Sequence, residues 1–231
     1  PLVFRPFHEN NGSWFWWGAA YCTPNQYKNL FRYTVSYLRE NKDLHNLLVA
    51  YSPNGPFTNA QDYASRYPGD AYVDVIGFDS YHRDPEPGDN LMDGFRKDMQ
   101  TVGQFAQTHH KLAAVTETGI LVGSKGGALA RNGNKRLDWF NEALRAISPQ
   151  NMAYFMTWSN FSEDNFDEPY MVTDKRGHEM INRFIDFYNQ PESVFAGQMP
   201  DYVQLHTKVA AAVQTYGSLT APDSYSSILT P

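Results

Sequence analysis

Short apolar runs alternate with longer segments of helical periodicity along most of the chain. The apolar runs have the length of buried strands and lie at residues 2–7, 47–51, 73–78, 112–115 and 152–158. Between and after these runs, apolar residues recur three and four positions apart, which predicts helices. The clearest helix faces contain Leu137, Phe140, Leu144 and Ile147; Phe95, Met99, Val102 and Ala106; and Ile181, Phe184, Ile185 and Tyr188. We therefore predict five units, each a strand followed by a helix.

The first predicted helix carries a start signal of its own. Thr23 precedes Pro24, and threonine favours the N-cap whereas proline favours the first helical position. The pattern predicts a helix over about residues 25–40. Its buried face would contain Tyr27, Leu30, Phe31 and Leu38.

Strands that are apolar on both faces and joined by helices predict a parallel sheet covered by helices, which is an α/β fold. A doubly wound sheet would carry a glycine-rich phosphate-binding loop after its first strand, and the sequence has none there. A (β/α)8 barrel instead places functional groups at the C-terminal ends of strands, where this sequence gathers polar residues. We therefore predict a (β/α)8 barrel in one domain over residues 1–190, with residues 191–231 as an extension packed on that domain.

Composition and charge exclude several other classes of protein. Hydrophobic residues make up 42% of the chain and aromatic residues 15%, which argues against disorder. The net charge is −6 and Lys and Arg form no run, so we expect no nucleic-acid partner. No apolar stretch approaches the roughly 18 residues that a membrane-spanning helix needs. Cys22 is the only cysteine, so the chain forms no internal disulfide.

Two glutamates, Glu9 and Glu117, each stand just beyond an apolar strand, so a barrel would aim both carboxylates into one mouth. Glycoside hydrolysis requires such a pair: one carboxyl protonates the leaving oxygen, and the other attacks the anomeric carbon or activates a water. Three tryptophans and a phenylalanine at residues 14–17 supply flat rings of the kind that stack on sugars. Position alone leaves a structural role open for these residues, because strand ends carry many acids and long loops often cover aromatic clusters.

Longer segments around these residues resemble known signatures. The segments are residues 4–9 (Phe-Arg-Pro-Phe-His-Glu), 11–18, 75–81, 115–119 and 158–160. They resemble, in the same order, the signatures of glycoside hydrolase family 26, the β-mannanases. The resemblance covers about residues 2–190. It implies a (β/α)8 barrel that cleaves β-1,4-mannosidic bonds within mannan, glucomannan or galactomannan, with retention of anomeric configuration and without cofactor or metal.

Carried over by position, the resemblance implies that Glu9 is the general acid/base and Glu117 the nucleophile of a double displacement. His8 would bind a substrate hydroxyl, and Tyr81 would orient Glu117. The remaining implied substrate-site residues are Trp14 on the leaving-group side, Trp158 on the floor of the reacting subsite, and Arg5 and Asp79 in the surrounding polar shell. We expect the Arg5 charge to keep the nucleophile ionised, while a drier environment lets Glu9 hold its proton near neutral pH.

In that family Glu9 would end the fourth barrel strand and Glu117 the seventh, so the resemblance implies that this chain contains strands four to eight. Five strands cannot close the barrel, and an open edge would leave unpaired backbone groups in water. We therefore expect the missing N-terminal strands to come from another segment or chain. From the first residues, which have the pattern of a strand, we expect no signal peptide within this chain. We nevertheless expect an extracellular or periplasmic location, because mannans are too large to enter a cell.

Two alternatives to the mannanase prediction stay open. A β-1,3-1,4-glucanase or a β-1,3-xylanase could use the same pair of glutamates, with loop residues deciding the substrate. A noncatalytic carbohydrate-binding protein could use the same frame, although the presence of both glutamates argues against it.

An acidic group at residues 163–168 could hold Ca²⁺, but a solvated loop is the favoured interpretation.

Overall fold

The computed structural model describes residues 2–121, 134–157 and 179–198. The chain divides into two compact units, Pro1–Gln190 and Pro191–Pro231, and each is described by itself. In the second unit the described part contains a short 3₁₀ turn at Ala196–Gln198. The packing of residues 191–231 on the barrel therefore stays a prediction.

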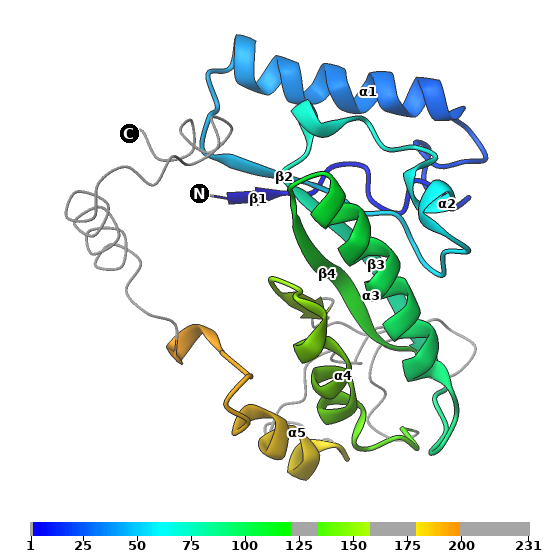
Figure 1. The fold of residues 1–231 in the computed structure, drawn as a ribbon, viewed down its shortest axis with the longest axis vertical. Helices are drawn as coiled ribbons and strands as arrows, with labels where there is room; N and C mark the ends of the chain where they lie inside the picture. The colour runs from blue at the N-terminus through cyan, green and yellow to red at the C-terminus, as the bar shows by residue number, and fades with distance from the viewer. Residues whose placement is uncertain (1, 122–133, 158–178, 199–231) are drawn as a thin grey trace, which may run out of the picture. The chain divides into compact units, whose positions relative to one another are not determined.

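Five parallel strands form one sheet, and each strand lies beside the next one in the sequence (Figure 1). They are β1 (Leu2–Phe4), β2 (Leu47–Tyr51), β3 (Val75–Arg83), β4 (Leu112–Leu121) and β5 (Phe155–Thr157). The order of a doubly wound sheet reverses partway across, whereas barrel strands follow the chain order. The observed order is thus that of half a (β/α)8 barrel, and it confirms the predicted fold class.

Helices follow the strands as predicted. They are α1 (Pro24–Ser36), α2 (Ala60–Ala64), α3 (Leu91–Thr108), α4 (Trp139–Ile147) and α5 (Ile181–Tyr188). The Thr23 hydroxyl caps α1 by accepting from the Gln26 backbone N–H, and Pro24 occupies the first helical turn, which confirms the predicted start. A π-helical turn at Tyr37–Asn41 extends α1, and the short α2 is the helix of the second predicted unit, for which the sequence pattern gave no range.

The predicted helix faces are right in the middle of the chain and partly wrong at its ends. The four predicted core positions of α3 are all buried. Leu137, in contrast, precedes α4 and is exposed. In α5 the buried side chain is Phe187, which packs with Phe184 against Phe140 of α4, whereas the predicted Ile185 and Tyr188 are exposed. In α1 Tyr27 and Phe31 are buried as predicted, together with Val35, but Leu30 is only half-buried, as is Leu38 in the π-helical turn that follows.

The central strands are longer than predicted, and β1 is shorter. Polar residues at the ends of β3 and β4 belong to the ladder, which continues to the pair of Arg83 and Leu121. β1 ends at Phe4 and pairs with β2 alone among the described residues. Leu2 and Val3 on this edge are 62% and 44% exposed, although parallel strands are ordinarily covered on both faces. The half-barrel thus leaves an apolar strand at its edge.

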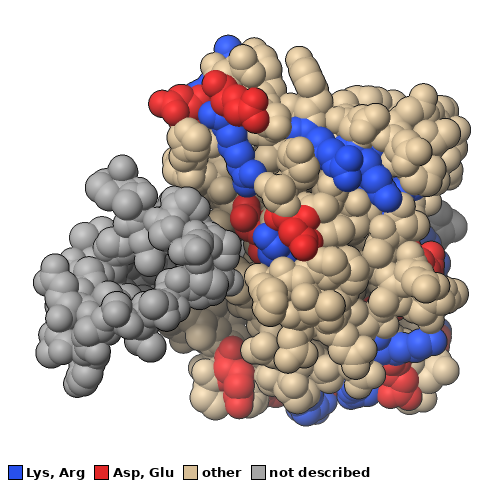
Figure 2. All heavy atoms as spheres, turned by 45° about the horizontal axis from the view of Figure 1, so that its top comes forward, with Lys and Arg blue, Asp and Glu red and all other residues tan. Residues whose placement is uncertain are grey.

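None of the described helices is long and apolar enough to cross a membrane. On the face of the molecule in Figure 2, basic and acidic side chains of the described residues lie in small groups beside one another.

Candidate active site

The carboxyl ends of the strands bring the predicted site residues together. β3 carries Asp79 and Tyr81, β4 carries Glu117, and the irregular segment after β1 carries His8 and Glu9. In the ladder between β3 and β4, Asp79 lies opposite Glu117. Neighbouring parallel strands end at the same edge of a sheet, so residues that are far apart in the sequence meet there.

A local irregularity in the ladder sets this alignment. Phe78 pairs with Val115, but the next residue, Asp79, pairs with Glu117, so Thr116 is skipped. The skipped Thr116 instead contacts β3 through its side chain, since its hydroxyl donates to the Phe78 carbonyl at 3.0 Å. A β carbon at Gly77 would lie 2.3 Å from Thr116 Cγ2, so glycine is required there. Bulges of this kind re-aim side chains next to active sites.

Arg5 joins the two carboxylates of the site. Its Nη1 donates to Asp79 Oδ2 at 2.7 Å, and its Nη2 donates to Glu117 Oε2. The Tyr81 hydroxyl donates to the other Glu117 oxygen, Oε1. Glu117 is buried, and both its oxygens accept hydrogen bonds, a role that an ionised carboxylate fills. Arg5 and Tyr81 thus fix the position of the Glu117 carboxylate.

Asp79 is fully buried and sits deeper than Glu117. Its Oδ1 contacts the hydroxyls of Ser52 at 2.6 Å and Thr116 at 2.9 Å. Burial raises the pKa of Asp79 to about 8, although the neighbouring Arg5 opposes the rise. Burial also lowers the pKa of Arg5, but the two carboxylates outweigh it and the net shift is upward. Arg5 therefore stays charged beside the two carboxyl groups.

Glu9 occupies a different environment. Its backbone has a φ of 50°, and its N–H donates to the Ser52 carbonyl at 2.7 Å. A non-glycine residue in this left-handed region costs roughly 1–3 kcal/mol, and such strain clusters at functional sites. Trp14 Nε1 donates to Glu9 Oε2 at 2.7 Å. Burial and the charge of Glu117 raise the pKa of Glu9, while Trp14 and Arg5 oppose the rise. A raised pKa is what a general acid requires.

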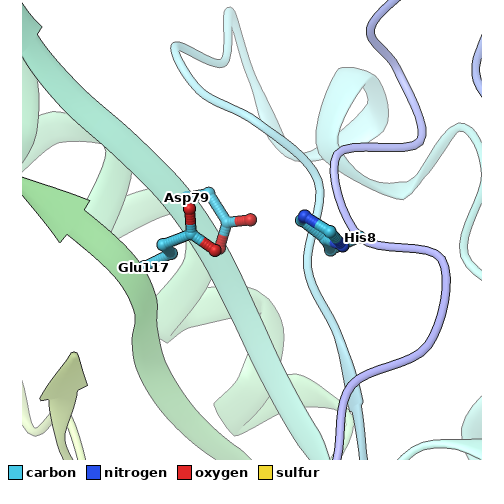
Figure 3. A group of neighbouring side chains, drawn as sticks. All are labelled: His8, Asp79 and Glu117. Atoms are coloured by element: carbon cyan, nitrogen blue, oxygen red, sulfur yellow. The ribbon is translucent and has the colours of Figure 1, made fainter. Parts of the chain in front are cut away.

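His8 faces the carboxylate pair from the segment after β1, as Figure 3 shows. Burial lowers the pKa of His8, and Arg5 adds to this effect, so the ring is neutral near neutral pH. His8, Asp79 and Glu117 each offer one possible ligand atom, and these three atoms lie within 4.8 Å of one another. Such a spacing could hold a metal ion. Arg5, however, already bonds to both carboxylates and supplies the positive charge there, so the residues present do not favour a metal.

The aromatic segment after Glu9 has two roles. Trp14 and Trp16 are 55% and 61% exposed and present their rings to solvent. Trp17 instead donates Nε1–H to the His8 carbonyl at 2.8 Å and stacks on Phe15 at 4.4 Å between ring centroids. A β carbon at Gly12 would lie 2.4 Å from the Trp14 ring, so glycine lets this indole reach Glu9. Trp14 is therefore placed to contact a ligand at Glu9, and Trp17 supports the backbone of His8.

Sequence reasoning missed two hydroxyl residues of the site, Ser52 and Thr116. Ser52 directly follows β2, at the same strand edge that carries the other site residues, and this position was the available signal. Thr116 gave no signal, because its role depends on the irregularity beside it. Trp158 lies outside the described residues, so its predicted place on the floor of the site stays a prediction.

A cavity of about 600 Å³ opens beside Glu9. Its lining comes from the segment after β1, which supplies Glu9 and Trp14, from residues 54–56 and 80–83, and from the start of α3. This volume is within the range of about 300–1,000 Å³ that small-molecule sites occupy. The paired carboxylates, the exposed indole and the cavity define a half-barrel with a ligand site at the C-terminal ends of its strands.

Comparison with known proteins gives the family. Residues 1–175 match the model of glycosyl hydrolase family 26, and the chain belongs to this family. It is 40% identical, over 93% of its own length, to a mannan endo-1,4-beta-mannosidase of Bifidobacterium adolescentis, of which it covers 22%. A mannan endo-1,4-beta-mannosidase of Bacillus subtilis is also 40% identical over 68% of this chain, which covers 39% of that protein.

Solved structures show the same relationship. A modular endo-beta-1,4-mannanase from Cellulomonas fimi superposes with a TM-score of 0.76 at 37% identity, over 87% of this chain and 43% of that one. The catalytic domain of a Bacillus sp. JAMB-750 endo-beta-1,4-mannanase superposes with a TM-score of 0.77 at 37% identity, over 86% and 52% of the two chains. The chain therefore spans about half of each solved structure, which fits the half-barrel described above.

Proposed function

We propose that the polypeptide that contains this chain is a retaining endo-β-1,4-mannanase acting on mannan, glucomannan or galactomannan. The observation that carries the proposal is the contrast between the two glutamates. Glu117 accepts hydrogen bonds from Arg5 and Tyr81 on both its oxygens, whereas burial raises the pKa of Glu9. Two carboxyl groups held in opposite states at one barrel mouth suit a nucleophile and a general acid. The mannanase names of the relatives supply the substrate class.

In the first step a Glu117 oxygen attacks the anomeric carbon of the reacting mannosyl unit. The bond to the leaving oxygen breaks as Glu9 gives its proton to that oxygen, so the leaving saccharide departs with a neutral hydroxyl. Arg5 and Tyr81 hold the attacking carboxylate in place, which lowers the entropic cost of reaching the anomeric carbon. His8, neutral and facing Glu117, is placed to bind a hydroxyl of the same sugar.

In the second step Glu9, now ionised, removes a proton from a water molecule that attacks the anomeric carbon. The bond to Glu117 breaks, and both glutamates regain their starting states. The Trp14 N–H donates to Glu9 and stabilises the carboxylate form that this step requires. Two inversions at one carbon give net retention of anomeric configuration.

We further propose that the barrel is completed by strands from another segment or chain. The apolar, exposed edge strand β1 supports this, because its edge away from β2 has unpaired backbone groups that need a partner strand. An extracellular or periplasmic location is part of the same proposal, since a mannan polymer cannot enter a cell. One relative, an Endoglucanase H of Acetivibrio thermocellus, is 28% identical over 63% of this chain, which keeps a β-glucanase as the second candidate.

The test is to incubate the complete polypeptide with mannan, glucomannan and mixed-linkage β-glucan in parallel, measuring new reducing ends and product size. Short manno-oligosaccharides from the first two substrates are expected, with the β-anomer seen first by NMR. Glu117→Ala should abolish turnover and retain binding, whereas Glu9→Ala should lose most on poor leaving groups. Activity on mixed-linkage glucan alone would move the function to the second candidate, and equal mild losses in both variants would refute the assigned roles.

A further inference from the structure

A buried histidine of the cavity has no part in the catalytic scheme above. His82 lies near the end of β3, is only 3% exposed and lines the cavity that contains Glu9. Its ring packs edge-on against Phe95 of α3, with 5.3 Å between the ring centroids. A polar ring in such a place requires partners for both of its nitrogens.

One partner is Trp139, the fully buried first residue of α4. Its Nε1 donates to His82 Nδ1 at 2.6 Å. The indole N–H can only donate, so Nδ1 must be the unprotonated nitrogen of the imidazole. Burial lowers the pKa of His82 to about 4, and Arg136 adds to this effect, so the ring is neutral near neutral pH. The proton of the neutral ring is therefore on Nε2.

The Nε2–H group is available as a hydrogen-bond donor to the cavity. No acceptor is bonded to it among the residues that the structure describes, although His82 is otherwise enclosed. Nε2 is not among the buried polar atoms that lack a partner, so this donor is open to the cavity, where a ligand oxygen can accept from it. The geometry fixes this donor in advance, because Trp139 holds the ring from the opposite edge.

The rest of the cavity lining indicates what kind of ligand would be bound. The described lining includes Glu9 and Trp14 but neither Glu117 nor Arg5, so the cavity adjoins the proton donor and not the nucleophile. Asp93, Asp98 and Arg83 also line it, so the lining carries charges of both signs and selects for neither an anion nor a cation. A neutral polyol fits, because each hydroxyl can accept from one group and donate to another.

We propose that His82, oriented by Trp139, donates a hydrogen bond from Nε2 to a hydroxyl of the leaving-group saccharide, which is the saccharide that Glu9 protonates. This inference rests on the proposed function and adds a specificity-determining residue on the leaving-group side. Trp139 acts as a positioning residue, since it reaches the substrate only through His82. The proposed roles of Glu9 and Glu117 stay the same when His82 and Trp139 are added.

The test uses the complete polypeptide and two variants of His82. His82→Asn keeps an acceptor near the Nδ1 position for Trp139 but lacks the Nε2–H, whereas His82→Gln places an amide donor near the Nε2 position. kcat/KM is measured on mannotetraose, which has a saccharide leaving group, and on an aryl β-mannobioside, which has none. We expect the ratio of the two kcat/KM values to fall about tenfold in His82→Asn and to recover in part in His82→Gln, as loss and rescue of one hydrogen bond require.

His45→Asn is the matched control, because His45 is exposed and does not line the cavity. Its ratio should equal that of the unmodified protein. An unchanged ratio in His82→Asn, or equal losses on both substrates, would overturn the inference while leaving the proposed function intact. If the unmodified protein cleaves neither substrate, the proposed function itself fails.

A second measurement examines the positioning role directly. ¹⁵N-labelled histidine spectra should show the His82 proton on Nε2 in the unmodified protein and a mixture of the two tautomers in Trp139→Phe. The same variant should lower the kcat/KM ratio in the direction of His82→Asn. A single unchanged tautomer in Trp139→Phe would remove Trp139 from the proposal.

Discussion

Replacing Trp14 by Phe should move the pH range of activity upward. Trp14 donates to Glu9 Oε2 at 2.7 Å and so favours the ionised form of Glu9, against burial, which raises the pKa of this glutamate. Phe retains an aromatic ring and removes the donor, so the pKa of Glu9 rises further. The proposed first step requires protonated Glu9, and activity is lost as pH rises through its pKa. The alkaline limb of kcat/KM should therefore shift to higher pH.

The size of the shift follows from the hydrogen bond. A hydrogen bond to a charged group contributes about 1.5–3 kcal/mol. Trp14 is 55% exposed, so water partly replaces and screens the lost bond, and we halve the contribution to about 0.75–1.5 kcal/mol. One pKa unit corresponds to 1.36 kcal/mol, so we expect the limb to move by about 0.5–1 pH unit.

The assay is the pH profile of kcat/KM on a manno-oligosaccharide in the complete polypeptide. Trp17→Phe is the matched control, because Trp17 donates to the His8 backbone carbonyl and not to a carboxylate. Its alkaline limb should stay where the unmodified protein has it, even if activity falls. A limb that moves downward in Trp14→Phe, or moves equally in both variants, would refute the assignment of Glu9 as the acid tuned by Trp14.

Three further substitutions probe the site and the fold. Tyr81→Phe removes a donor to Glu117 and should lower kcat about 10–100-fold with a smaller change in KM, as steady-state kinetics would show. Gly77→Ala places a methyl group 2.3 Å from Thr116 Cγ2 and should lower the free energy of unfolding by about 1–3 kcal/mol in urea titration. Thr23→Ala removes the cap of α1 and should lower the free energy of unfolding by about 1 kcal/mol without affecting activity.

Most of the fold could be predicted from the sequence because it depends on local periodicity. β2 has the predicted limits, and Thr23 begins the first helix as its residue type indicates. The ends of β3 and β4 were missed because Asp79 and Glu117 are polar, and polarity was taken as the end of a strand. These residues face the site and remain in the ladder, so in a barrel a strand end cannot be placed from hydropathy alone.

The site was predictable as a set of residues but not as a set of contacts. Motif resemblance pointed to Arg5, Asp79 and Glu117, and the structure joins these three directly. It could not indicate Ser52 or Thr116, because single hydroxyl residues are common and their roles here arise from tertiary contact across three strands. Asp79 had been assigned to a polar shell, and its complete burial changes its contribution, since burial rather than the Arg5 charge dominates its pKa.

The two glutamates show how one barrel edge can hold two carboxyl groups in different environments, as the proposed acid and nucleophile require. Both are carboxyl groups at strand ends, so their position alone predicts the same chemistry for each. Glu117 lies within β4 beside Arg5, and its two oxygens bind a cation and a phenol. Glu9 lies on a strained turn, where its side-chain donor is an indole and burial favours the proton. The irregular segment after β1 therefore creates the difference in environment that the proposed double displacement requires, and substitutions there should change the pH range of activity more than those in β4.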